Sequence, residues 1–354
     1  MTEHSNISSI DPTARQAALS TARELKLHRV LVPLDGRPAA EYAIPFAVML
    51  AKWFKSELTL FHTLRPMHPA RGGRPGQVRY PDALHDRGSS LASAYMEEVA
   101  YRLQPHDVRV RWGVATGDTA EMIATRSATG SFGLIAMTAR QRKRVHRRFQ
   151  PGVLGALWQL TAVPLLLVNE RRVHINGFPV EEPRDIIVPY GVNSIAGDAL
   201  PMATALAGAS GARIRLLRAT DKEEVEEPPQ AAQDAPTEQE LEQEEETPPA
   251  ASGLPDDMEA VAEWLKKRGI ESVIEIVRGD VTAAVAQRQT DLPRSWVVVA
   301  SRMRAGISRS ILGSVTDHVV RELSGPAVVV PAASTALRRH HRAHTVSQKP
   351  PDTP

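Results

Sequence analysis

Arg29-Val-Leu-Val-Pro-Leu34 and its later counterpart Asp185-Ile-Ile-Val-Pro-Tyr190 decide the fold, because they mark the start of two similar units. The Val-Pro pairs of the two stretches lie 156 residues apart. Further along, Gly117-Asp118 is repeated by Gly279-Asp280 at an offset of 162 residues. Offsets that hold over long stretches indicate an internal duplication, and one variable stretch in the middle of each copy absorbs the difference.

Each copy alternates short apolar runs with helical patterns. Runs rich in Val, Ile and Leu are typical of strands, and the predicted strands are 29–34, 58–63, 108–112, 133–137, 164–168, 185–190, 213–218, 272–277, 296–300 and 327–330. The predicted helices between them are 39–54, 90–103, 119–126, 153–160, 196–209, 257–268, 281–288 and 311–323. This alternation predicts an α/β fold of two tandem, doubly wound, parallel five-stranded sheets. In such sheets, ligands bind beyond the carboxyl ends of the strands.

The duplication gives the domain organisation. The chain has 354 residues, which is enough for two domains with a core each. The predicted segments are a flexible N-terminal segment 1–27, copy one at 28–171, copy two at 183–332 with an acidic, disordered insertion at 221–255, and a basic, disordered tail at 333–354.

The insertion and the tail differ sharply in charge. From Asp221 to Glu246 there are twelve acidic residues and one lysine, a net charge of −11, although the whole chain carries +2. The rest of the chain therefore carries about +13, and its tail contains Arg338-Arg339-His340-His341-Arg342. A stretch of this composition with several prolines buries too little apolar surface to order itself. The histidines of the tail fit a basic segment better than a metal site.

Composition excludes several classes of protein. The chain contains no cysteine, which rules out disulfide frameworks, cysteine–zinc sites, iron–sulfur clusters and cysteine nucleophiles. No apolar run approaches the roughly 20 residues of a membrane span, and the start of the chain lacks the pattern of a secretory signal. We therefore expect a cytoplasmic protein.

At this level of detail both copies resemble the universal stress protein family. Copy one opens with strand 29–34, Asp35-Gly36, Glu41 and Ala43-Ile-Pro45, which look like the family's first strand, acidic turn and first helix. Copy two ends with Val297 to Val315, which is similar to the family's fourth strand, glycine loop and last helix. The resemblance implies the family's α/β fold and pairing of the last strands, 164–168 with 326–330, so that the two copies form an intramolecular pseudo-dimer.

Some members of that family bind ATP through a Gly-x2-Gly-x9-Gly-Ser/Thr loop, in which glycines let the backbone approach the phosphates. The resemblance carries this role, in copy two, to Ala300, Met303, Gly306, Gly313 and Ser314. Gly313-Ser314 is intact, although Ser314 also suits a plain helix cap. A long side chain at Met303 works against close approach of a phosphate. The acidic partner is also missing, because Gly191 stands where copy one has Asp35.

Copy one shows the reverse loss. Asp35, the candidate contact to the nucleoside, is present, but Thr138, Gln141, Pro151 and Gly152 replace the glycine loop. An Asp-Gly pair is also common in plain turns. The expectation is therefore that copy one does not bind ATP in the manner of the family, and that ATP is an open candidate ligand for copy two.

A dense run of cations stands where copy one has lost its loop. The segment Arg140–Arg148 contains six Arg and Lys side chains and His146. Three interpretations compete: a solvated loop, a docking site for the chain's own acidic residues 223–246, and a site for an external anion such as a nucleotide, polyphosphate or nucleic acid. Aromatic residues are 5% of the chain and no helix-turn-helix pattern is evident, so sequence-specific DNA reading is not predicted.

No catalytic motif emerges from the sequence. The phosphate loop of P-loop enzymes, the dinucleotide fingerprint, the zinc-protease motif and the nucleophile elbow are all missing. The leading hypothesis is a stress-response tandem with a regulatory or protective role, which binds unknown protein partners and is not an enzyme. A further homodimer stays open. The alternatives are an ATP-binding protein that uses Gly313-Ser314, where slow hydrolysis stays open, and an anion- or nucleic-acid-binding module built on Arg140–Arg148.

Overall fold

The computed structural model describes residues 11–66, 81–139, 152–169, 180–190, 196–220, 258–301 and 324–331. The strands of copy one are β1 (Arg29–Leu34), β2 (Glu57–Leu64), β3 (Arg109–Thr116), β4 (Leu134–Ala139) and β5 (Leu165–Asn169). Its helices are α1 (Pro12–Glu24), α2 (Ile44–Phe54), α3 (Pro81–Leu103), α4 (Thr119–Thr129) and α5 (Val153–Leu160), with short 3-10 helices η2 (Pro38–Ala43) and η3 (Gln104–His106).

Copy two repeats this order. Its strands are β6 (Asp185–Pro189), β7 (Arg213–Thr220), β8 (Ser272–Arg278), β9 (Ser295–Ser301) and β10 (Ala327–Pro331). The described helices are α6 (Ala196–Ser210), α7 (Met258–Lys266) and α8 (Val281–Asp291). All ten predicted strands are confirmed, most to within two or three residues at each end. The predicted helix 311–323 lies outside the described residues.

The strands form one continuous sheet rather than two separate ones. Their order is β3-β2-β1-β4-β5-β10-β9-β6-β7-β8. Neighbouring strands within each copy are parallel, which confirms the doubly wound α/β fold. At the centre, β5 and β10 pair antiparallel, with Leu166 opposite Val328. The two last strands that the sequence analysis expected to meet are therefore neighbours, and the two five-stranded halves join edge to edge.

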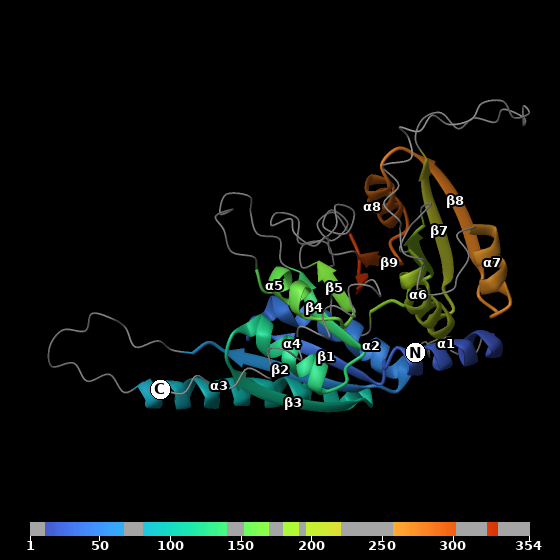
Figure 1. The fold of residues 1–354 in the computed structure, drawn as a ribbon. Coiled ribbons are helices and arrows are strands. Elements are labelled where there is room, and N and C mark those ends of the chain that lie inside the picture. Colours follow the sequence, from blue (N-terminus) through green and yellow to red (C-terminus); the bar gives the residue numbers. More distant parts are fainter. Residues whose placement is uncertain are drawn as a thin grey trace, which may run out of the picture.

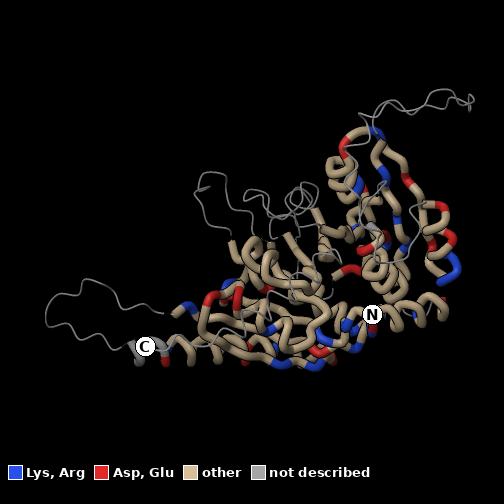
Figure 2. The backbone as a smooth tube through the Cα atoms, viewed as in Figure 1, with Lys and Arg blue, Asp and Glu red and all other residues tan. Residues whose placement is uncertain are grey.

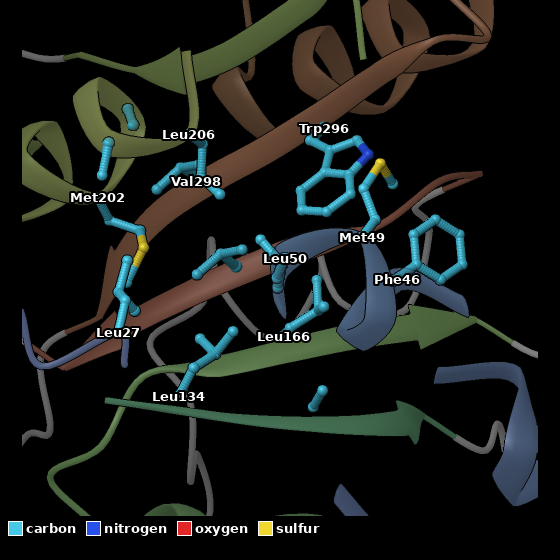
Figure 3. Close-up of a cluster of buried hydrophobic side chains, with 14 of the residues drawn as sticks. Leu27, Phe46, Met49, Leu50, Leu134, Leu166, Met202, Leu206, Trp296 and Val298 are labelled. Carbon is cyan, nitrogen blue, oxygen red and sulfur yellow. The ribbon is translucent and has the colours of Figure 1, made fainter. Parts of the chain in front are cut away.

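Helices cover both faces of the sheet (Figure 1), and the core on each face contains residues of both copies. Helix α2 is apolar on nearly every side, as expected for a helix that is buried between the strands of copy one and copy two. Phe46 and Trp53 of α2 contact the ring of Trp296 on β9, at centroid distances of 5.8 and 6.0 Å. Figure 3 shows side chains of both copies meeting here, with Leu50 and Leu166 of copy one near Met202 and Val298 of copy two.

The duplication extends to the caps of equivalent helices. Asp118 accepts hydrogen bonds from the backbone N–H groups of Ala120 and Glu121, at 3.0 and 3.2 Å, and so caps α4. Asp280 caps α8 in the same way, through Thr282 and Ala283, at 3.0 and 2.8 Å. The repeated Gly-Asp pair of the sequence is therefore a strand exit followed by a helix N-cap in each copy.

Charged pairs at the start of the strands have opposite signs in the two copies. In copy one, Arg29 of β1 forms an ion pair with Glu57 of β2. At the matching positions of copy two, Asp185 of β6 forms an ion pair with Arg213 of β7. Asp185 also pairs with Arg215, which continues to Glu275 of β8 and then to Arg288 of α8. Charged residues of both signs lie along β7 and β8 in the upper right of Figure 2.

The N-terminal segment differs from the expectation of a flexible residue range 1–27. Residues 12–24 form helix α1, which starts at Pro12 after the cap Asp11 and buries Ala14, Ala18 and Ala22. This helix packs against α6, so the N-terminal segment contacts copy two as well as copy one (Figure 1). The sequence pattern did not show this contact, because a stripe of alanines gives a weak apolar signal.

Close packing of α1 on α6 depends on Gly208. A Cβ atom at Gly208 would lie 2.4 Å from the carbonyl oxygen of Ala14 and 2.8 Å from Cβ of Ala18. We expect Gly208→Val to push α1 away and to lower the free energy of unfolding by about 1–3 kcal/mol, as overpacking does. Urea unfolding of the full chain measures this. The control is Gly88→Ala, a helix position where an added Cβ meets nothing within 4 Å, and equal stability of both variants would contradict the packing role.

Candidate functional site

The carboxyl end of β1 in copy one carries the predicted residue Asp35. Asp35 is exposed, and its Oδ1 accepts a hydrogen bond from the backbone N–H of Arg37 at 3.1 Å. Gly36 has a φ of +78°, a left-handed conformation that favours glycine. Asp35 and Gly36 thus form the turn that leads into η2, which is the plainer of the two roles that the sequence allowed.

Next to this turn, Glu41 of η2 is held by two residues of α3. The Tyr95 hydroxyl donates to Glu41 Oε1 at 2.9 Å, and Arg102 Nη2 forms an ion pair with Oε2 at 2.8 Å. Burial, followed by the hydrogen bond to Glu41, raises the pKa of Tyr95 well above its ordinary value. The phenol therefore stays protonated at neutral pH and keeps donating to the carboxylate. Both oxygens of Glu41 are engaged within the chain.

His62 of β2 completes this polar cluster. Its Nδ1 lies 2.9 Å from the carbonyl oxygen of Leu34, the last residue of β1. Because a carbonyl oxygen only accepts, Nδ1 carries the proton of this bond. The His62 ring meets the Tyr95 ring edge-on at a centroid distance of 6.3 Å. We call Asp35, Glu41, His62, Tyr95 and Arg102 the copy-one cluster.

The point between β1 and β4, where a doubly wound sheet reverses its strand order, is bridged by the chain itself. Thr138 at the end of β4 donates its hydroxyl to the carbonyl oxygen of Ala40 in η2, at 3.2 Å. Thr138 stands at the first position of the lost glycine loop. The bond ties η2 to β4 across the crevice in which such folds bind their ligands.

Copy two lacks the counterparts of this cluster. Gly197 stands at the position of Glu41 and Arg218 at the position of His62. Ala300, the first of the five candidate ATP-loop residues, lies at the buried end of β9. Met303, Gly306, Gly313, Ser314 and Gly191 lie outside the described residues, as do the Arg140–Arg148 run, the acidic insertion and the tail. Their predicted roles stay predictions.

The described part of the chain offers neither a metal site nor a membrane-spanning helix. No group of three or more His, Asp or Glu side chains is placed to hold a metal ion there. In the same residues, no helix is both long and apolar enough to cross a membrane.

The architecture defines the class of protein: two doubly wound α/β units, joined through their last strands into one sheet, with candidate sites at the carboxyl ends. The chain belongs to the universal stress protein family, whose model matches residues 26–169 and 183–331. Each match covers one copy. The family and the tandem arrangement expected from the sequence are therefore confirmed.

Solved structures agree with this fold. The chain is similar to a functionally unknown protein from Pseudomonas aeruginosa PAO1, with 15% identity, a TM-score of 0.61, and coverage of 92% of this chain and 99% of the other. It is also similar to a universal stress protein from Archaeoglobus fulgidus DSM 4304, with 16% identity, a TM-score of 0.62, and coverage of 86% and 99%. A search of curated proteins finds no match.

Sequence reasoning placed Asp35 correctly at the end of β1 but missed three members of the copy-one cluster. Tyr95 and Arg102 are seven residues apart, which is two helical turns, so they share one face of a predicted helix. That spacing was a usable signal, but nothing in the sequence tied this face to Glu41. His62 lies inside an apolar strand pattern, where it looks like a core residue.

Proposed function

We propose that this protein is a stress-response tandem that acts by binding, not by turnover, in a regulatory or protective role in the cytoplasm. In this proposal copy one has lost nucleotide binding of the family type, and it serves as a structural and recognition unit for protein partners. The single observation that supports this most directly is that the polar side chains of the copy-one cluster already have bonding partners within the chain. These side chains bond to one another and to the backbone.

Three contacts support the loss of nucleotide binding in copy one. Asp35 accepts from the backbone of its own turn, Glu41 is held by Tyr95 and Arg102, and Thr138 bonds η2 across the switch point. A nucleotide at this end would have to break some of these bonds. Because these groups are exposed or only partly buried, each lost bond costs about 0.5–1.5 kcal/mol.

A second candidate function is ATP binding by copy two. It is favoured by the lack of a Glu41 counterpart at Gly197, which leaves this end without the carboxylate that η2 presents in copy one. Gly313-Ser314 would then meet the phosphates with backbone amides and a hydroxyl at the start of a helix. The long side chain of Met303 works against ATP binding, because it hinders close approach of a phosphate to the backbone.

Calorimetric titration of the full chain with ATP and Mg²⁺ separates the two candidates. We expect no saturable binding below about 1 mM, which corresponds to about −4 kcal/mol. Saturable binding that Gly313→Val abolishes and Asp35→Ala leaves unchanged would replace the first candidate by the second. Binding that Asp35→Ala abolishes would show that copy one is a nucleotide site after all.

A further inference from the structure

The two copies differ in the length of the helix before their third strand. Met96, Val99 and Leu103 of α3 correspond to Met258, Val261 and Leu265 of α7 at the offset of 162 residues, and all six are buried. Helix α3 continues in the N-terminal direction from Met96 to Pro81, whereas α7 begins at Met258. Figure 1 shows α7 beside the lower part of β8 only.

Among the described residues, no helix covers the part of the copy-two sheet face that corresponds to the first turns of α3. Val114 of β3 packs against the core in copy one, but its counterpart Ile276 of β8 is 66% exposed. Ile276 pairs with Arg218 of β7, and Arg278 pairs with Thr220, so these side chains share one face of the parallel pair. We call Arg218, Thr220, Ile276 and Arg278 the β7–β8 face.

This face carries positive charge that the described residues do not neutralise. The Nε atom of Arg218 is buried and has no hydrogen-bond partner in the described part of the chain. Arg278 is exposed and forms no ion pair with any described residue. A buried, unpaired polar atom is costly and calls for a partner that brings acceptors. An exposed isoleucine between two arginines suits a partner that is both acidic and partly apolar.

The sequence offers such a partner at short range. The chain leaves the face at Thr220 and returns at Met258, and the residues from Asp221 to Glu246 carry a net charge of −11. This stretch contains Pro248, Pro249 and Pro255, and proline is unfavourable inside a helix. A segment fixed at both ends beside a surface has a high effective concentration there, of the order of mM.

We propose that residues 221–257 dock on the β7–β8 face, with carboxylates paired to Arg218 and Arg278 and apolar side chains on Ile276. The occupant is thus the chain's own acidic insertion. The contact does not depend on the proposed function, because it involves neither the copy-one cluster nor the candidate ATP loop. Since it rests on charge, it weakens as salt is added.

The absence of cysteine in the sequence allows a direct test. Ile276→Cys introduces one thiol on the face, and Leu91→Cys on α3 is the matched control, because the two side chains are 66% and 65% exposed. A benzophenone maleimide attached to each thiol is activated by light in the full chain at low salt. Mass spectrometry then identifies the linked peptides.

We expect the label at position 276 to link chiefly to residues 221–257 of the same chain, and the label at position 91 not to do so. The links should fall at least severalfold at about 0.5 M salt. They should fall equally in a variant whose twelve acidic residues between 221 and 246 are changed to Asn or Gln, but not when the exposed Glu24, Glu97, Glu98 and Glu263 are changed to Gln. Links mainly between two chains would assign the face to a second copy and overturn the proposal. Equal links from positions 276 and 91, or no effect of charge removal, would also overturn it.

Discussion

Trp296→Ala is expected to lower the free energy of unfolding by about 3–5 kcal/mol, the range typical of large aromatic side chains removed from a core. Trp296 is buried on β9, and its ring contacts Phe46 and Trp53 of the other copy. The substitution therefore leaves a cavity at the junction between the two halves as well as removing apolar contact. The effect should appear as earlier unfolding of both halves, because the core on this face is continuous across them.

Urea unfolding of the full chain, followed by circular dichroism, measures this effect. The control is Trp112→Ala on the edge strand β3, where the indole is 40% exposed. We expect that variant to lose clearly less stability than Trp296→Ala, because 40% of the Trp112 surface is already in water and its removal leaves no enclosed cavity. Similar losses at both positions would show that the aromatic contact between the copies contributes little to stability.

Asp185→Ala is expected to be the most damaging change to a single charge, with a loss of about 3 kcal/mol or more. The carboxylate is buried, and Oδ1 accepts from Nε of Arg213 at 2.6 Å and from Nε of Arg215 at 2.7 Å. Its removal leaves two arginines side by side on β7. Arg215 is the costly one, because its side chain is 13% exposed, whereas that of Arg213 is 39% exposed and partly screened by water.

Thermal and urea unfolding of two single variants, Asp185→Ala and the control Glu271→Ala, tests this prediction. Glu271 is the other acidic neighbour of Arg213. Its Oε1 lies 3.8 Å from Nη1 of Arg213 and its side chain is 73% exposed, so Glu271→Ala should leave the free energy of unfolding almost unchanged. A double variant, Asp185→Ala with Arg215→Leu, should recover part of the lost stability, because it removes the buried cation that has lost one of its two carboxylates. Glu275 keeps its ion pair with Arg288 in that variant. No recovery would mean that the cost arises from packing at Asp185 rather than from charge.

The fold could largely be predicted from the sequence, because strand patterns and turn residues are local signals. The strands matched well for this reason. The capping role of Asp118 and Asp280 was not predicted and was seen only in the structure. Helix α1 was missed because its partner Gly208 lies nearly 200 residues away and its buried face consists of alanines. Helix α3 was predicted from residue 90 but begins at Pro81, because its first turns have little apolar periodicity.

The candidate site could be predicted less well, because it depends on contacts between distant elements. The sequence gives Asp35 its place after β1, but its hydrogen bond to Arg37 is a matter of loop geometry. The bond between Tyr95 and Glu41 joins residues 54 positions apart. No local pattern indicates such a pairing, so the structure was needed to see that the carboxylate is already engaged.

The opposite signs of the strand pairs bear on how two units of the same fold avoid exchanging strands during synthesis. If β1 paired with β7, Arg29 would lie beside Arg213, and if β6 paired with β2, Asp185 would lie beside Glu57. Like charges directly opposite each other disfavour such hybrids. In each copy, the ion pair thus favours pairing of that copy's own first two strands. This matters most during synthesis, when copy one has folded and copy two is still being made.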